Sequence, residues 1–366
     1  MTDRNEVRQM DAANAPGPSL DSVKERLRVQ GLQVVYPLQN VKVRAIDDVS
    51  LEIREKEFVA IVGESGSGKS TLALAIIGLL PRSTEISGNL EYNGENLLAL
   101  DDEGWNKIRG NEIGMIFQEP LSSLNPITKI GEQMAEALQR KNSAKVYDHS
   151  PGKAEFGRSF RTSGLMHRKM PAEIYGEIIR WLKLVRIPDP ESVVEKYSFE
   201  LSGGMMQRIM IAMVLSQNPS LLLADEPTTA LDVTTQAQIL KLMLNLRKLS
   251  NASVIFVTHD LAVGAHVADR VIVMYAGDVV EDASTEQIFS NPLHPYTQAL
   301  IRCFPQGHKS QGALGTIPGN IIDLKSEVNG CKFADRCEFV KDACREGKPR
   351  YVESEKGHYV RCTKYY

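Results

Sequence analysis

The alternation of hydrophobic and polar residues changes character several times along the chain. Val, Leu and Ile alternate with polar residues over 29–35 and 45–53, which is typical of strands with one buried face. Apolar residues at helical spacing predict helices over 69–80 and 235–249. The run 58–62 is wholly apolar, as expected of a strand buried on both faces of a sheet, and 221–224 and 253–257 are predicted as two more buried strands. Strands and helices in this order predict an α/β fold with a mainly parallel sheet.

Three segments depart from this pattern. Residues 1–27 are polar and rich in small residues and Pro, which predicts a flexible tail. Residues 141–171 have no apolar period and carry seven Lys and Arg against two Asp and Glu. We interpret this basic insertion as a solvated surface loop, with contact to anionic lipid headgroups as the alternative. The pattern loosens again near 289, where we place a boundary between a main domain, 28–289, and an extension, 290–366.

Composition narrows the class of protein. The 366 residues are 42% hydrophobic and 24% charged, as in ordinary globular proteins. A formal net charge of −3 gives no electrostatic reason to expect nucleic acid as a partner. The chain has neither an apolar run of about 18 residues nor an N-terminal signal-peptide pattern. We therefore expect a cytosolic chain that reaches a membrane only through its partners.

A glycine-rich segment indicates a phosphate site. Residues 63–70 read G-E-S-G-S-G-K-S and fit the P-loop pattern, between a predicted strand and a predicted helix. Glycines let successive backbone N–H groups point at phosphate, and the helix N-terminus adds positive potential. Lys69 suits the β- and γ-phosphates and the Ser70 hydroxyl suits Mg²⁺. The nucleotide-binding candidates here are Gly63, Ser65, Gly66, Gly68, Lys69, Ser70 and Thr71.

Two acids and a histidine follow apolar strands. Asp225 and Glu226 come directly after the run 221–224, and His259 ends another predicted strand. Such residues lie at the carboxyl edge of the sheet, where α/β proteins bind ligands. Asp225 suits Mg²⁺, and Glu226 suits a general base that activates water against the γ-phosphate. His259 is expected to contact the γ-phosphate, so the predicted cofactors are ATP and Mg²⁺.

Further motifs resemble the ABC transporter ATPases. Residues 201–208, L-S-G-G-M-M-Q-R, resemble the family signature. The other matches are Gln118 in a Q-loop, Asp232 in a D-loop over 229–232, His259 as switch histidine and Tyr36 against adenine. The resemblance implies a P-loop NTPase core with a β-subdomain and a helical subdomain over about 119–215. It also implies that Gln118 takes part in catalysis and binds Mg²⁺.

The signature implies a partner. A hydroxyl and bare N–H groups at a helix start form an anion site, here from Ser202, Gly203 and Gly204. In the family this site meets the γ-phosphate bound by the opposite subunit, so that two ATP lie between two chains. The resemblance therefore implies that a monomer is nearly inactive.

The sequences of two segments resemble those of the oligopeptide/dipeptide import ATPases. These are 121–127, L-S-S-L-N-P-I, and 291–297, N-P-L-H-P-Y-T. The resemblance implies a second, non-identical ATPase subunit, two permease subunits, an extracytoplasmic substrate-binding protein and a peripheral place on the cytoplasmic face of the membrane. Nickel or an oligosaccharide remains an alternative cargo. A soluble ABC ATPase acting on DNA or ribosomes is the other alternative, but such proteins carry a long coiled coil or two cassettes.

Four cysteines cluster near the C-terminus, separated by 5, 6 and 17 residues. They are Cys331, Cys337, Cys344 and Cys362. A reducing cytosol disfavours disulfides, which points to a metal, but the spacing fits neither the usual zinc pairs nor common ferredoxin patterns. The importer ATPases' extension implies a [4Fe–4S] cluster, with zinc or unligated thiols as alternatives. We expect this site to be structural or sensing and remote from the ATP chemistry.

Overall fold

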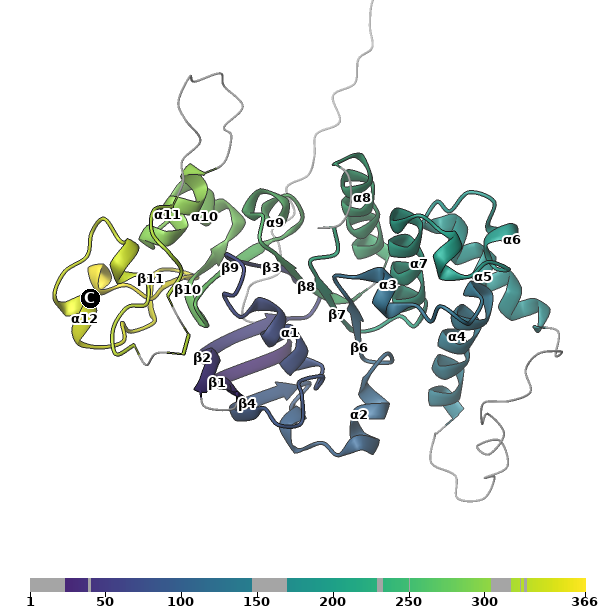
Figure 1. Ribbon diagram of the computed structural model, residues 1–366, viewed down its shortest axis with the longest axis horizontal. Coiled ribbons are helices and arrows are strands. Elements are labelled where there is room, and N and C mark those ends of the chain that lie inside the picture. The colour runs from purple at the N-terminus through teal and green to yellow at the C-terminus, as the bar shows by residue number, and fades with distance from the viewer. Residues whose placement is uncertain are drawn as a thin grey trace, which may run out of the picture.

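The computed structural model describes residues 24–38, 41–146, 170–228, 233–249, 251–303, 317–322, 324–325 and 328–366. Two sheets and a group of helices make up this part of the chain (Figure 1). Most of the predicted N-terminal tail, most of the basic insertion and the D-loop with Asp232 lie outside the described residues. The tail is predicted to reach residue 27, but a strand already begins at Glu25 and Leu27 is buried.

The larger sheet has eight strands in the order β11-β12-β10-β9-β3-β8-β7-β6. Neighbours from β9 to β6 pair in parallel, whereas β10, β11 and β12 are antiparallel additions. The parallel strands are Phe58–Val62 (β3), Ile113–Ile116 (β6), Leu221–Asp225 (β7), Ser253–Thr258 (β8) and Arg270–Tyr275 (β9). The antiparallel ones are Asp278–Ser284 (β10), Val352–Glu355 (β11) and His358–Val360 (β12). The predicted α/β class with a mainly parallel sheet is therefore confirmed.

The smaller sheet is antiparallel, in the order β2-β1-β4-β5. Its strands are Glu25–Leu38 (β1), Val41–Arg54 (β2), Glu85–Tyr92 (β4) and Glu95–Asn96 (β5). The alternating residues predicted as half-buried strands lie in β1 and β2, which each run for 14 residues. This sheet shares one hydrophobic core with the larger sheet and with the helix that follows the P-loop, Lys69–Ile76 (α1).

The helices divide into two sets. A helical region with its own core contains Pro120–Ser123 (α3), Ile130–Val146 (α4), Ala172–Leu184 (α5), Pro190–Val193 (α6) and Gly203–Ser216 (α7). The others are Lys69–Ile76 (α1), Asp102–Ile108 (α2), Val233–Leu249 (α8), Leu261–Val267 (α9), Thr285–Ser290 (α10), Pro295–Arg302 (α11) and Ala343–Glu346 (α12).

Helix α1 ends earlier than the predicted residue 80. Gly78 has φ +67°, and a Cβ there would lie 2.4 Å from the Trp105 ring. The chain turns at this glycine because only a residue without Cβ fits against the indole.

The C-terminal segment is part of the main sheet. Strand β12 pairs with β10, and β11 pairs with β12. Two lysines hold the segment to the core. Lys332 Nζ lies 3.0 Å from Asp47 Oδ2, and Lys348 Nζ lies 2.7 Å from Asp278 Oδ1. Burial raises the pKa of the Asp47 carboxyl, but the lysines, Lys332 above all, outweigh burial and hold that pKa below its usual range.

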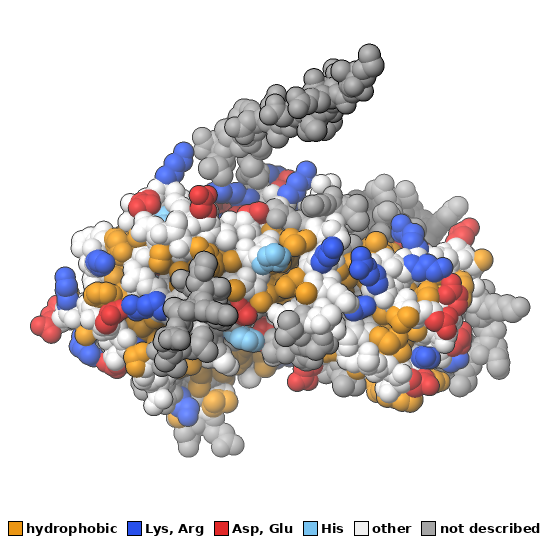
Figure 2. Space-filling view, turned by 90° about the horizontal axis from the view of Figure 1, so that it is seen from above, with side chains coloured by type: hydrophobic (Ala, Val, Ile, Leu, Met, Phe, Trp, Pro, Cys, Tyr) orange, Lys and Arg blue, Asp and Glu red, His pale blue; other side chains and the backbone are white. Residues whose placement is uncertain are grey.

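The described surface is mixed in polarity. On the face seen in Figure 2, hydrophobic side chains are interspersed with charged ones, and Lys and Arg gather over the helical region. Within the described ranges, no helix combines the length and the apolar content needed to cross a bilayer.

Candidate functional site

The P-loop joins β3 to α1 at the carboxyl edge of the large sheet. Gly66 and Gly68 have φ +81° and +97°, a region that side chains with a Cβ rarely adopt. A Cβ on Gly68 would lie 2.5 Å from the carbonyl oxygen of Ala45. The loop therefore packs directly on strand β2, and the glycines are required by its geometry.

Lys69 is turned into the loop. Its ammonium donates to the carbonyls of Gly63 at 2.8 Å and Glu64 at 2.9 Å, and to Ser67 Oγ at 3.3 Å. The side chain is 4% exposed, and burial lowers the pKa of its ammonium below the usual range. Lys69 thus lies inside the P-loop, and its ammonium is hydrogen-bonded to carbonyl groups that a phosphate can replace.

Ser70 and Asp225 come together from different elements. The Ser70 hydroxyl, in the first turn of α1, donates to Asp225 Oδ1 at 3.0 Å at the end of β7. Burial raises the pKa of the Asp225 carboxyl above its usual range. A hydroxyl and a buried carboxylate side by side are oxygen ligands of the kind that Mg²⁺ prefers, so these residues fit that ion.

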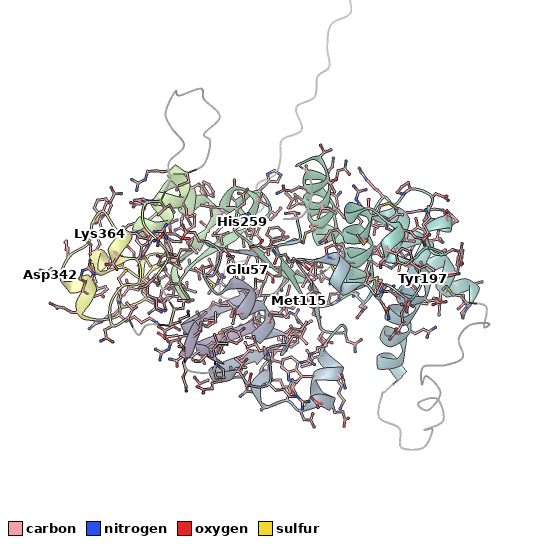
Figure 3. All side chains as sticks on the ribbon, in the orientation of Figure 1. Glu57, Met115, Tyr197, His259, Asp342 and Lys364 are labelled. Carbon is pink, nitrogen blue, oxygen red and sulfur yellow. The ribbon has the colours of Figure 1, made fainter. Side chains whose placement is uncertain are left out.

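Glu226 contacts two other residues that are predicted to take part in catalysis, Gln118 and His259. Its Oε2 accepts a hydrogen bond from Gln118 Nε2 at 3.3 Å and lies 3.2 Å from His259 Nδ1. Glu226 has φ +43°, a strained conformation for a residue with a Cβ, of the kind that gathers at functional sites. His259 lies near the middle of the molecule (Figure 3) and its side chain is 52% exposed, so the group opens to solvent.

Tyr36 lies beside the P-loop helix. Near the end of β1, its hydroxyl donates to Thr71 Oγ1 at 3.4 Å. The ring therefore lies beside the P-loop, where it can stack on the adenine base of a bound nucleotide. Ser65 and Gly66 form the exposed outer turn of the loop.

The signature residues lie in the helical region. Ser202 caps α7 and accepts a hydrogen bond from Met205 N at 3.3 Å, and Gly203 and Gly204 form the first turn. Tyr197, shortly before them, lies well to one side of His259 in Figure 3. The chain does not bring its signature to its own P-loop, which leaves the Ser202 end of α7 open to a partner.

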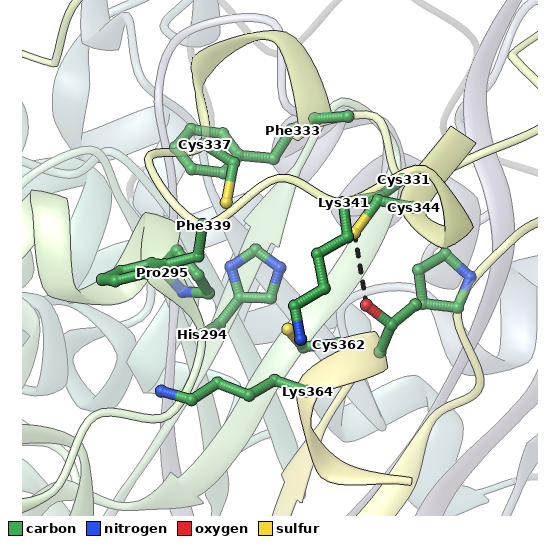
Figure 4. Close-up of a pocket in the computed structure, with 13 residues that line it drawn as sticks. His294, Pro295, Cys331, Phe333, Cys337, Phe339, Lys341, Cys344, Cys362 and Lys364 are labelled. Atoms are coloured by element: carbon green, nitrogen blue, oxygen red, sulfur yellow. Dashed lines mark hydrogen bonds between the residues drawn. The ribbon is translucent and has the colours of Figure 1, made fainter.

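The four clustered cysteines line one cavity of about 190 Å³ in the extension (Figure 4). Lys341, Lys364 and His294 also line it. Burial raises the pKa of the Cys331 thiol to about 12, and burial also raises the pKa values of Cys337 and Cys362. Cys344 Sγ lies 3.2 Å from Thr363 Oγ1.

The predicted metal centre is not supported by this arrangement as it stands. Across the ranges that the structure describes, no three or more His, Cys, Asp and Glu side chains are grouped so that they could hold a metal ion. Buried thiols with raised pKa values remain protonated until a metal displaces the proton. The cysteines are gathered on one cavity, but the sulfurs are not preset as ligands.

The segment that carries the cysteines contacts the P-loop, whereas the role of the cysteine cluster itself stays a prediction. Arg336, directly before Cys337, forms a bidentate ion pair with Glu64 in the P-loop, with N–O distances of 2.7 and 3.0 Å. Tyr296 OH accepts a hydrogen bond from Glu64 N at 2.9 Å. Sequence reasoning missed Glu64, Tyr296 and Arg336. Tyr296 lies in the recognised segment 291–297, but nothing local marks Arg336, since its partner is 272 residues away.

Comparisons with known proteins agree with this geometry. Residues 46–229 match the ABC transporter family model, and 280–344 match that of the oligopeptide/dipeptide transporter C-terminal region. The chain is 40% identical to the oligopeptide transport ATP-binding protein AppD of Bacillus subtilis, over 93% of this chain and 96% of AppD. It is 40% identical to the dipeptide transport ATP-binding protein DppD of Haemophilus influenzae, over 88% of this chain and 91% of DppD.

A solved structure shares the fold. It is a dimeric ATP-binding cassette in a post-hydrolysis state with ADP and phosphate. It matches with a TM-score of 0.55 and 28% identity, over 71% of this chain and 98% of that one.

Proposed function

The chain belongs to the ABC transporter ATPase family, and we propose that it binds and hydrolyses ATP to power an importer of dipeptides or oligopeptides. The observation that carries this proposal is the convergence of Gln118 and His259 on Glu226, next to the Ser70–Asp225 pair. The relatives named above transport oligopeptides or dipeptides, which favours peptide over nickel or oligosaccharide as cargo.

The residues divide the work as follows. Lys69 leaves its carbonyl partners and binds the β- and γ-phosphates, while loop N–H groups hold the remaining oxygens. Ser70, Asp225 and Gln118 would hold Mg²⁺, which would supply positive charge beside the phosphates. Glu226 accepts the proton of the attacking water, and His259 contacts the γ-phosphate and orients Glu226. Tyr36 stacks on adenine.

We propose that the site is completed by a second ATPase subunit, a non-identical paralogue. Ser202 and the N–H groups of Gly203 and Gly204 offer an anion site that is exposed and unused within the described part of this chain. Asp232 is assigned to the same contact by its motif alone. ATP then binds between the two subunits and holds them together.

We propose two permease subunits as the further partners, docked near Gln118. Ile127, nine residues on, is 84% exposed and is therefore accessible to a partner. The ATPase would then lie peripherally on the cytoplasmic face of the membrane, and a substrate-binding protein would deliver cargo outside. For the basic insertion, 141–171, we keep both interpretations: a solvated surface loop, or a contact with anionic lipid headgroups.

The dimer gives a direct test. Glu226→Gln keeps the shape of the side chain and loses the base, so MgATP should bind without being hydrolysed. Light scattering of this variant mixed with its partner ATPase should show a dimer with MgATP and monomers without it. A mass that does not respond to MgATP would overturn the sandwich.

We also propose that Cys331, Cys337, Cys344 and Cys362 hold a [4Fe–4S] cluster when the protein is loaded. Four thiols and no carboxylate line the cavity, which is a donor set of the kind that iron–sulfur clusters use, and two lysines there would offset the negative charge of four thiolates. The sulfurs would have to move together to bind a cluster. The cluster would supply a cross-link that stabilises a small segment.

Anaerobic purification tests this assignment. The protein should be brown, with about four iron and four sulfide per chain, and Cys337→Ser should be colourless. One zinc per colourless chain would replace the cluster with a zinc site, and metal-free protein would leave reduced thiols.

A further inference from the structure

The C-terminal segment contacts the P-loop through the buried guanidinium of Arg336. The Arg336 side chain is 5% exposed, and it binds Glu64 with Nη1–Oε2 at 2.7 Å and Nη2–Oε1 at 3.0 Å. Two parallel bonds between a planar fork and a carboxylate fix both position and orientation.

The remaining donors of Arg336 are also occupied. Nε donates to the Pro318 carbonyl at 3.0 Å, Nη2 to the Ile317 carbonyl at 3.3 Å, and Nη1 to Tyr275 OH at 3.3 Å. The bond to Glu64 has the largest effect on the pKa of the guanidinium and raises it, whereas burial lowers it by less. Arg336 is therefore a fixed charge whose place is determined by the segment that carries it.

That place depends on the cysteine loop. Arg336 ends a 3-10 helix, Ala334–Arg336, whose first N–H donates to the Cys331 carbonyl at 3.0 Å. Cys331 N in turn donates to the Cys344 carbonyl at 2.7 Å. A change in the cysteine loop therefore moves the guanidinium.

On the other side, Glu64 is joined to the phosphate-binding lysine. Its carbonyl accepts from Lys69 Nζ at 2.9 Å and from Ser67 N at 3.1 Å, and its carboxylate acts electrostatically on the Lys69 ammonium. Without a cation beside it, this carboxylate would attract Lys69 and repel ATP phosphates.

Other contacts also attach the segment to the core. Lys332 and Lys348 already bind Asp47 and Asp278, and β12 pairs with β10. A further ion pair that reaches the second residue of the P-loop does more than fasten the two parts together.

We propose that Arg336 is a positioning residue for the nucleotide site, which neutralises Glu64 and leaves Lys69 available to the phosphates of ATP. The proposal rests on the proposed ATPase function. It makes the C-terminal segment, and the cysteine loop in it, a determinant of ATP affinity.

The experiment measures the dissociation constant of MgATP with the full chain by calorimetry. Arg336→Gln should weaken binding about tenfold, within the usual range of coupling between sites. Adding Glu64→Gln to that variant should restore affinity to within about threefold of the wild type, because no charge then needs neutralising. The matched control is Arg345→Gln, which breaks the exposed 2.7 Å pair with Asp335 in the same segment and should change nothing.

Two results would overturn the proposal. One is wild-type affinity in Arg336→Gln. The other is a double variant as weak as Arg336→Gln, since that would mean a scaffold role without the electrostatic one. If Arg336→Gln is partly unfolded at the assay temperature, Arg336→Lys keeps the charge and should bind within about threefold of the wild type, and a tenfold loss there would contradict the argument. A wild-type chain that binds no MgATP would instead refute the proposed function.

Discussion

Two glycines in one loop separate backbone strain from steric contact. Gly66 and Gly68 both have positive φ, but a Cβ on Gly66 meets nothing within 4 Å, whereas one on Gly68 lies 2.5 Å from Ala45 O and 3.0 Å from Ile46 Cδ1. Alanine at either position incurs the left-handed backbone cost of about 1–2 kcal/mol. Alanine at 68 adds an overpacking cost of about 1–3 kcal/mol.

Gly68→Ala should therefore lower the free energy of unfolding by about 2–5 kcal/mol, and Gly66→Ala by about 1–2 kcal/mol. The assay is urea unfolding of the nucleotide-free chain, followed by circular dichroism. Absence of nucleotide matters, because lost phosphate contacts would otherwise add to both values. Equal destabilisation by the two variants would refute the close approach of the P-loop to strand β2.

Two further predictions concern Mg²⁺ and the base. Burial raises the pKa of Asp225, so the stability that its protonated form provides is present at low pH and lost as pH rises through that raised pKa. Asp225→Asn should therefore raise the melting temperature of the metal-free chain at pH 7 and not at pH 4, and an equal shift at both would contradict the burial argument. Tyr36→Ala should weaken MgATP binding about 5- to 150-fold, from about 1–3 kcal/mol of base stacking. Tyr36→Phe, which loses only the 3.4 Å bond to Thr71, should bind nearly as the wild type, and equal loss in both would count against stacking.

Much of the nucleotide site could be predicted because its chemistry is local in sequence. The P-loop needs glycines at fixed spacing before Lys69, and Asp225 and Glu226 follow an apolar strand directly. A parallel sheet then brings the ends of β3, β7 and β8 to one edge, so the convergence follows from the fold class. No pattern in the sequence predicts the positive φ of Glu226. Its contacts with Gln118 and His259, which only the structure shows, explain why this strain is tolerated.

The end of the chain was harder to predict. Strands β11 and β12 are four and three residues long, and the place of β12 beside β10 depends on pairing across about 80 residues. The Arg336–Glu64 pair spans 272 residues, and neither residue type is unusual at its position. Contacts of this kind come from tertiary packing, which periodicity and motif spacing do not encode. The contact between the cysteine segment and the P-loop could not be predicted for this reason.

We propose that ATP hydrolysis at this chain's site powers peptide import. The measurement is the rate of ATP hydrolysis and of labelled-peptide uptake in vesicles that contain the chain, its partner ATPase and the permeases, with and without the peptide-loaded binding protein. Peptide should stimulate hydrolysis and uptake, and Glu226→Gln should lower both by about 10²–10⁴-fold. Hydrolysis that ignores peptide, or uptake that persists at the wild-type rate in Glu226→Gln, would contradict this proposal.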